Sequence, residues 1–250
     1  MNVAITLNLI HLISILLALV FLFLLFKVVE SKWSYRISKP HNWEEAVKQG
    51  KISNKLKKLE RSYRDKVRFY TFWLQIERIK NQNIPGAFAE MGVYQGDTAR
   101  LIHEMDVSRT FHLFDTFEGF DQKDLAFEKS KDEKYSTENF SDAILDEVKL
   151  HVDGNENVHF HVGYFPDSAK DIKEPIYAFV HLDADLYLPT LTALKYFYPK
   201  LYAGGVIMIH DYNHTWDGIP KAINEFIKTI PESIQEIADW QGSVMIVKNG

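Results

Sequence analysis

The sequence predicts an α/β protein with a doubly wound parallel sheet and a terminal antiparallel hairpin, preceded by one transmembrane helix. Three observations lead to this prediction. Short apolar runs alternate with helical patterns after residue 86, the last two apolar runs follow each other over a short link, and an uncharged stretch stands at the N-terminus. Short links and right-handed crossovers place strands that alternate with helices in one parallel sheet.

The uncharged stretch is Val3–Phe26, which is rich in Leu, Ile, Val and Phe. As a helix it would be about 36 Å long, enough to cross a hydrocarbon layer of about 30 Å. It lacks the basic leading region and the A-x-A site of a cleaved signal peptide, so we expect a retained anchor at residues 1–28. Four basic residues lie within Lys27–Lys39. The positive-inside rule then predicts a single-pass membrane protein whose C-terminal domain is cytoplasmic.

Charge divides the rest of the chain. Residues 27–80 carry nine more Lys and Arg than Asp and Glu, whereas residues 81–250 carry fourteen more acids than bases. Residues 29–66 are therefore expected to form a basic juxtamembrane linker with helices. The run Lys48–Arg68 is expected either to lie close to anionic headgroups or to form a solvated helix face. The acidic domain at 67–250 argues against nucleic acid as a partner. The absence of Cys excludes disulfides and thiolate metal sites.

The elements of the domain follow from apolar periodicity. Helices are expected over Val67–Ile79, through Arg100–Leu101, over Phe140–Val148, from Pro189 to Leu201 and from Pro220 to Ile230. Strands are expected at Ala87–Ala89, Thr110–Phe114, Val158–Val162, Ile176–Leu182 and Val206–Ile209, with a terminal hairpin of Ile234–Ala238 and Ser243–Val247. The polar segment Gly119–Tyr135 predicts a loop.

The stretch Gly86–Leu101, GAFAEMGVYQGDTARL, joins a buried strand to the start of a helix. Glycines at such a turn let the backbone come close to a ligand, and the helix N-terminus behind them offers free N–H groups. A carboxylate at Glu90 suits an ammonium or a hydroxyl group better than a phosphate. Tyr94 stands where the dinucleotide fingerprint would have its second glycine. The pattern therefore argues against a dinucleotide.

Acidic residues follow four successive predicted strands, at Glu90, Asp115, Asp183 and Asp211. In an open α/β sheet the carboxyl ends of the strands form the ligand site. Carboxylates that converge there repel one another unless a cation or a ligand compensates them. Asp115 follows the second strand, where nucleoside-binding folds place an acid that accepts hydrogen bonds from ribose hydroxyls.

The motifs EMGVYQGD, FDTFEGF, HVGYFPDS, HLDADLY and GGVIMIHDY resemble, in this order, the macrocin O-methyltransferase family (TylF/MycF-like). The resemblance covers roughly Arg68–Val247. It implies a Rossmann-like class I methyltransferase fold, S-adenosyl-L-methionine as cofactor and divalent-metal-dependent O-methylation of a sugar. The residues that it implies for cofactor binding are Glu90, Gly92, Tyr94, Gly96, Asp115, Gly163 and Tyr164.

The resemblance also implies a metal site at Asp183, His210 and Asp211, with Asp183 as the catalytic residue. These residues end consecutive strands, which lie about 4.8 Å apart, so that their side chains can share one ion. A bound cation would lower the pKa of a substrate hydroxyl and leave a carboxylate to take the proton. His210, however, stands where the family has an acid. This leaves three alternatives, a softer ion such as Mn²⁺, an altered Mg²⁺ site, or a lost site.

The predicted function is that of a membrane-anchored, metal-assisted O-methyltransferase acting on a hydroxyl of a sugar or glycoconjugate. The anchor favours a lipid-linked acceptor, and a homo-oligomer is compatible with the sequence. One alternative is a membrane scaffold that binds S-adenosylmethionine without catalysis, which the change at His210 leaves open. A second alternative, a nicotinamide-dependent oxidoreductase, is disfavoured by Tyr94.

Overall fold

The computed structural model describes residues 2–128, 135–173, 175–213 and 217–250, and the side chains of residues 2–8 and 32–38 lie outside that description. The chain divides into two compact units, Met1–Lys51 and Ile52–Gly250. The first unit contains the helices α1 (Asn2–Ser38) and α2 (His41–Lys48). Within α1, Leu9–Ser31 is long and apolar enough to cross a membrane by length and composition, and all of its side chains are exposed.

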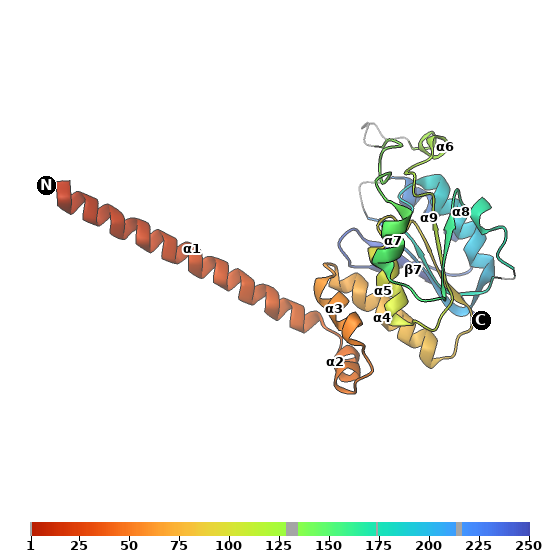
Figure 1. Ribbon diagram of the computed structural model, residues 1–250, viewed down its shortest axis with the longest axis horizontal. Helices are drawn as coiled ribbons and strands as arrows, with labels where there is room; N and C mark the ends of the chain where they lie inside the picture. The colour runs from red at the N-terminus through yellow and green to blue at the C-terminus, as the bar shows by residue number, and fades with distance from the viewer. Residues whose placement is uncertain (1, 129–134, 174, 214–216) are drawn as a thin grey trace. The chain divides into compact units, whose positions relative to one another are not determined.

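The second unit is built on a seven-stranded sheet (Figure 1). Its strands follow the order β3-β2-β1-β4-β5-β7-β6. The strands are β1 (Ala87–Met91), β2 (Phe111–Asp115), β3 (Val158–Val162), β4 (Tyr177–Leu182), β5 (Leu201–Ile209), β6 (Gln235–Ile237) and β7 (Ser243–Val247). The first five are parallel, and β7 runs antiparallel to β5 and β6. The order reverses between β1 and β4, which is the switch point where such sheets bind ligands. The predicted sheet and its terminal hairpin are confirmed.

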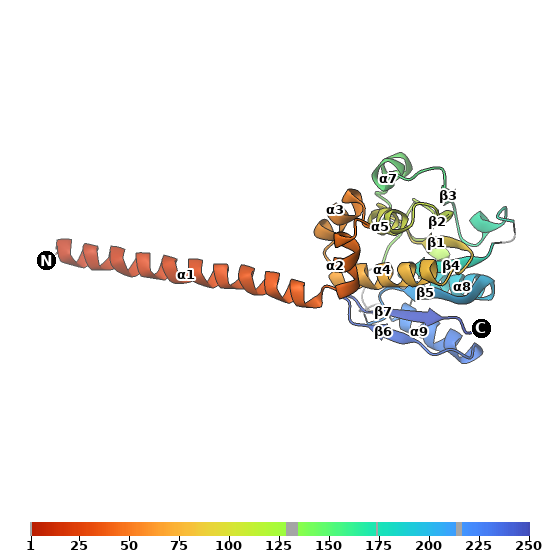
Figure 2. The ribbon, with the colours of Figure 1, turned by 90° about the horizontal axis from the view of Figure 1, so that it is seen from below.

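Helices cover both faces of this sheet (Figure 2). On one face α8 (Tyr187–Phe197) and α9 (Gly218–Phe226) pack against the apolar side chains of the central strands. On the other face lie α4 (Lys66–Asn81) and α5 (Asp97–Met105), and the ring of Phe72 contacts Phe179 edge-on with centroids 5.8 Å apart. All six residues of β4 are buried, as expected for a parallel strand covered on both faces.

Side-chain caps define the two helices of the second unit that precede the sheet. Ser53 Oγ accepts a hydrogen bond from the N–H of Leu56 at the start of α3 (Asn54–Ser62). Asp65 Oδ1 accepts one from the N–H of Arg68 at the start of α4. Such caps contribute about 1 kcal/mol each. The cap at Asp65 fixes the first turn of α4, which carries Arg68, a residue that lines the cavity described below.

The remaining elements are short and correct three expectations. They are α6 (Gln122–Leu125), α7 (Leu145–Val152) and the 3₁₀ turns η1 (Asp167–Ala169), η2 (Tyr198–Lys200) and η3 (Ile227–Thr229). The expected loop Gly119–Tyr135 contains α6, and its residues 129–134 lie outside the described residues. Phe140 is not part of α7. The helix from Pro189 was predicted to reach Leu201, but α8 ends at Phe197, because Pro199 has no N–H to continue it.

Candidate active site

The carboxyl ends of the five parallel strands surround a cavity of about 500 Å³. This volume lies in the range of small-molecule sites, about 300–1,000 Å³. Nine of the ten residues predicted for the site line it, namely Gly92, Tyr94, Gly96, Asp115, Gly163, Tyr164, Asp183, His210 and Asp211. Glu90 does not contribute to the lining that the structure describes. The topology therefore gathers the predicted motifs at one place.

Gly92 and Gly96 shape the loop between β1 and α5. Their φ angles of 88° and 86° lie in the left-handed region that glycine adopts readily. A Cβ on Gly92 would lie 1.9 Å from the backbone oxygen of Asp183, and one on Gly96 would lie 2.7 Å from Cγ2 of Val152. These glycines thus allow the loop to pack closely against the end of β4 and against α7. The loop itself forms a wall of the cavity, with the N-terminus of α5 behind it.

Asp115 holds this loop in place from the end of β2. Its Oδ2 accepts hydrogen bonds from the N–H groups of Val93 at 2.7 Å and Tyr94 at 2.9 Å, and its Oδ1 accepts one from Phe117 at 2.7 Å. A carboxylate has about four acceptor positions, so capacity remains for a ligand hydroxyl. Asp115 therefore combines a structural role with the geometry expected of a ribose-binding acid.

Glu90 is buried between β1 and β4, where its Oε1 lies 2.9 Å from Nδ1 of His181. Burial, reinforced by Asp183 and Asp115, raises the pKa of Glu90 well above its ordinary value, and burial lowers the pKa of His181 to about 3. His181 is therefore neutral near pH 7, and its contact with Glu90 is a hydrogen bond rather than an ion pair. Oε2 of Glu90 has no partner within the described structure. Its contact with a ligand ammonium stays a prediction.

Aromatic rings line the side of the cavity near β3. Tyr164 donates its hydroxyl to Oδ1 of Asp124 at 2.7 Å, and Nζ of Lys123 lies 3.2 Å from the centre of its ring. Across the cavity wall, Tyr94 and Phe140 meet edge-on with centroids 5.0 Å apart. Flat apolar surfaces of this kind suit a nucleobase. The place of Phe140 at the cavity was not predicted, because its spacing from the next apolar residues led to its assignment to the following helix.

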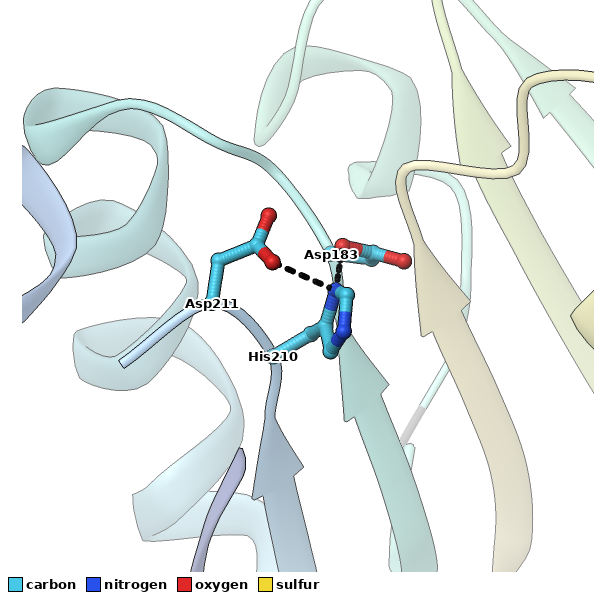
Figure 3. Close-up of side chains that lie close together, drawn as sticks. All are labelled: Asp183, His210 and Asp211. Atoms are coloured by element: carbon cyan, nitrogen blue, oxygen red, sulfur yellow. Dashed lines mark hydrogen bonds and ion pairs between the residues drawn. The ribbon is translucent and has the colours of Figure 1, made fainter. Parts of the chain in front are cut away.

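Asp183, His210 and Asp211 come together at the ends of β4 and β5 (Figure 3). Nδ1 of His210 lies 2.9 Å from Oδ1 of Asp183 and 3.1 Å from Oδ1 of Asp211. One potential ligand atom of each residue lies within 4.8 Å of the others. The side chain of Asp183 is 26% exposed and that of Asp211 is 3% exposed. The structure thus brings these three residues together as predicted, and Asp183 is the more exposed of the two carboxylates.

Arg68 reaches the same cluster from α4 and was not anticipated. Its Nη2 donates to Nε2 of His210, and its Nε donates to Oδ2 of Asp239 at 3.0 Å. Burial, the largest single influence, lowers the pKa of His210, but Asp183 and Asp211 outweigh it and raise that pKa. A second ring proton would occupy Nε2, where Arg68 already donates. The described contacts therefore fit a neutral ring with its proton on Nδ1.

Asp185 is a further acid of this cluster that sequence analysis passed over. It lines the cavity, and burial, together with Asp183 and Asp211, raises its pKa well above the ordinary range. This shift favours the protonated form of Asp185, which reduces the repulsion among the acids. It lies within the quoted motif HLDADLY, so the motif contained the signal that could have identified it.

A family model described as Macrocin-O-methyltransferase (TylF) matches residues 28–245. The chain belongs to the macrocin O-methyltransferase family. The predicted membership is thus confirmed. The fold also agrees with that of solved methyltransferases. The O-methyltransferase NovP superposes with a TM-score of 0.62 at 23% identity, covering 74% of this chain and 81% of that one. The calicheamicin methyltransferase CalS11 superposes with a TM-score of 0.54 at 17% identity, covering 71% and 79%.

Two curated relatives of this macrocin O-methyltransferase family protein come from Streptomyces. One, from Streptomyces olivaceus, is named 8-demethyl-8-(2,3-dimethoxy-alpha-L-rhamnosyl)-tetracenomycin-C 4'-O-methyltransferase and is 26% identical over 148 residues, 55% of this chain and 57% of its own. The other, the demethyldecarbamoylnovobiocin O-methyltransferase of Streptomyces niveus, is 27% identical over 150 residues, 55% of this chain and 56% of its own. The chain thus spans somewhat more than half the length of these relatives.

The resemblance to the macrocin O-methyltransferase family implied a divalent metal, and the contacts of His210 test whether one fits. A metal-bound imidazole donates its other ring N–H to an acceptor such as a carboxylate or carbonyl. Here the partner of the other ring nitrogen is the guanidinium of Arg68, which can only donate. Mg²⁺ also prefers oxygen ligands to imidazole. The side chains as arranged therefore do not fit a hard divalent ion.

Proposed function

We propose that this chain is an S-adenosylmethionine-dependent O-methyltransferase that methylates a hydroxyl group of a sugar or glycoconjugate at a membrane surface. The observation that carries the proposal is the single cavity in which the loop after β1, Asp115 after β2 and Tyr164 after β3 lie together. These are the positions that hold the methionine, ribose and adenine parts of the cofactor in the family that the chain resembles. Metal assistance is not part of the proposal.

The charge of the cavity supports a cationic cofactor. The described lining contains seven Asp residues, and Arg68 is its only Lys or Arg. Such a lining attracts the sulfonium and ammonium groups of S-adenosylmethionine, whereas the pyrophosphate of a nicotinamide dinucleotide would be repelled. The oxidoreductase alternative is therefore disfavoured by the charges around the cavity as well as by Tyr94 in the loop.

The chemistry needs few groups from the protein. S-adenosylmethionine supplies an activated methyl group, and the acceptor oxygen displaces it from sulfur. The exposed part of the Asp183 carboxylate can accept the hydroxyl proton as the new bond forms. The relatives support a sugar acceptor, because the name of the Streptomyces olivaceus enzyme contains a rhamnosyl group.

The N-terminal helix supports a membrane location. Leu9–Ser31 presents apolar side chains that no described residue covers, and an exposed apolar helix of this length is stable in a hydrocarbon layer. The basic residues within Lys27–Lys39 favour a location of the C-terminal domain in the cytoplasm. The cytoplasm is also where S-adenosylmethionine is made. An acceptor that is itself held at the membrane, such as a lipid-linked sugar, would meet the cavity most often.

Two measurements test the proposal. Isothermal titration of the full-length chain in detergent is expected to show binding of S-adenosylmethionine and none of NAD⁺. Radiolabelled S-adenosylmethionine, incubated with glycolipid fractions from cells that lack the protein, is expected to give a labelled glycan heavier by one methylene group. Absence of cofactor binding would overturn the proposal, and cofactor binding without transfer to any fraction would favour the scaffold alternative.

A further inference from the structure

Arg68 holds a fixed position beside the cavity. Its Nε donates to Oδ2 of Asp239 at 3.0 Å, and its side chain is only 9% exposed. Asp239 is fully buried and accepts two more hydrogen bonds, from the N–H and the hydroxyl of Ser243, both at 2.6 Å. The guanidinium is therefore locked in orientation by the loop between β6 and β7.

The fixed guanidinium determines which nitrogen of His210 carries the ring proton. Because Arg68 can only donate, Nε2 of His210 must accept, and the proton of the neutral ring lies on Nδ1. That N–H points toward Asp183 and Asp211, at 2.9 Å and 3.1 Å. His210 thus connects one buried cation to two carboxylates.

We infer that the Arg68–His210 pair takes the place of the divalent cation expected at this edge of the sheet, so that methyl transfer by this chain needs no metal. The inference rests on the proposed function and adds to it the means by which the two carboxylates are held. A metal ion would neutralise Asp183 and Asp211 and fix their separation. The Nδ1–H of His210 donates to Asp183, Oδ1 of Asp211 lies 3.1 Å from the same nitrogen, and the permanent charge of Arg68 compensates both carboxylates from behind the ring.

The reaction balances without a further reactant. The acceptor oxygen forms a bond to the methyl carbon while the bond from that carbon to sulfur breaks, and the electron pair of the broken bond stays on sulfur. The hydroxyl proton passes to the carboxylate of Asp183. The products are a methyl ether and S-adenosylhomocysteine. In this scheme Asp183 touches the substrate, whereas Arg68 and His210 are positioning residues that keep its carboxylate aimed at the cavity.

Metal binding tests the inference without knowledge of the acceptor. Mn²⁺ is titrated into the full-length chain in detergent, in the presence of S-adenosylhomocysteine, and the bound fraction is measured by electron paramagnetic resonance. The double variant Arg68→Met, His210→Asp restores a third acid and removes the opposing guanidinium, so its affinity for Mn²⁺ is expected to exceed that of the unmodified chain about 10–100-fold. Arg64→Met, which removes an exposed arginine, is the matched control and should change nothing. Equal Mn²⁺ affinity in the unmodified chain and the double variant would overturn the inference.

A second measurement takes its main result from the unmodified chain and so does not depend on the folding of a variant. The long-range ¹H–¹⁵N spectrum of the chain labelled in its histidine rings reports which nitrogen carries the proton, with His210→Gln identifying the signal. A neutral His210 protonated on Nδ1 is expected, and protonation on Nε2, alone or together with Nδ1, would contradict the inference. Calorimetry with S-adenosylhomocysteine is a separate check, because a failure to bind it would remove the proposed function while these two results still decide the question of the metal.

Discussion

The two sides of the cavity are built in different ways. On the side of β1, β2 and β3, Asp115 is held by the backbone N–H groups of Val93, Tyr94 and Phe117, all within 22 residues of it. On the side of β4 and β5, His210 is held by Arg68, which lies 142 residues away, and Arg68 is held by Asp239 at a separation of 171 residues. The first side is a local loop structure, and the second is a network of side chains that only the complete fold assembles.

This difference indicates which parts of the site can vary independently. A loop held by backbone groups keeps its shape when neighbouring side chains change, because the N–H donors remain. A network of charged side chains depends on each member, since removal of one leaves another charge buried without its partner. The side of β4 and β5 is also where this chain departs from its family, at His210. We therefore expect substitutions to affect the two sides differently, the first in binding and the second in rate.

The largest effect is expected at Asp183. Asp183→Asn keeps the size of the side chain but removes the proton acceptor, which should lower the rate of methyl transfer by about 10²–10⁴-fold. Binding of S-adenosylmethionine should change little. The rate is measured with radiolabelled cofactor and glycolipid fractions, and Asp146→Asn, whose side chain is 91% exposed, is the control. A loss of cofactor affinity as large as the loss of rate would contradict the division between the two sides.

The next effect is expected at Asp115. Asp115→Asn leaves a backbone N–H or a ribose hydroxyl without its acceptor, at a cost of about 1–3 kcal/mol. Binding of S-adenosylmethionine, measured by calorimetry, should weaken about tenfold or more. The rate at saturating cofactor should stay close to that of the unmodified chain. Unchanged affinity would show that Asp115 serves the loop alone and would remove it from the cofactor site.

Sequence analysis succeeded where one segment contains both the reactive residue and its support. The loop with Gly92 and Gly96 and the acid at Asp115 could be placed at the cavity because strand, turn and helix signals surround them, and their part in cofactor binding stays a prediction. Asp183 and His210 could be placed together because parallel strands end at the same edge of a sheet. Arg68 could not be found, because nothing in its local helical pattern indicates that its side chain meets His210. The position of β7 between β5 and β6 could not be predicted from the sequence either, since a hairpin alone does not fix which of its strands pairs with the sheet.

The histidines on β2 and β3 form a third region, which lies outside the cavity and can be compared with its two sides. His112 on β2 stands 2.9 Å, Nδ1 to Nε2, from His161 on β3. Burial, assisted by the neighbouring His161 and His159, lowers the pKa of His112 to about 4. The unfolded chain takes up this proton near pH 6.5, whereas the folded chain resists it down to about pH 4. The contribution of His112 to the free energy of unfolding is therefore fully present above pH 6.5 and is lost progressively as the pH falls toward 4.

We expect the midpoint of thermal unfolding to fall by several degrees between pH 7 and pH 5, and to fall less in His112→Asn. Circular dichroism at a series of pH values measures it. His41→Asn, in the first unit, is the control and should keep the pH dependence of the unmodified chain. Cofactor affinity at pH 7 should be equal in all three proteins. If His112→Asn altered that affinity, the region would have to be counted as part of the cofactor side.

The smallest effect is expected from removal of metal. If the Arg68–His210 pair supplies the positive charge at the ends of β4 and β5, then EDTA should leave both cofactor binding and the rate of methyl transfer unchanged. The same treatment should inhibit the variant Arg68→Met, His210→Asp, in which two carboxylates and a third acid lack a fixed cation and bind one from solution. The measurement is the initial rate with and without excess EDTA, followed by addition of Mg²⁺ or Mn²⁺. An unmodified chain that loses its activity in EDTA and recovers it with Mg²⁺ would show that Arg68 moves away from His210 to admit an ion, and the network at β4 and β5 would then be a resting state rather than the working one.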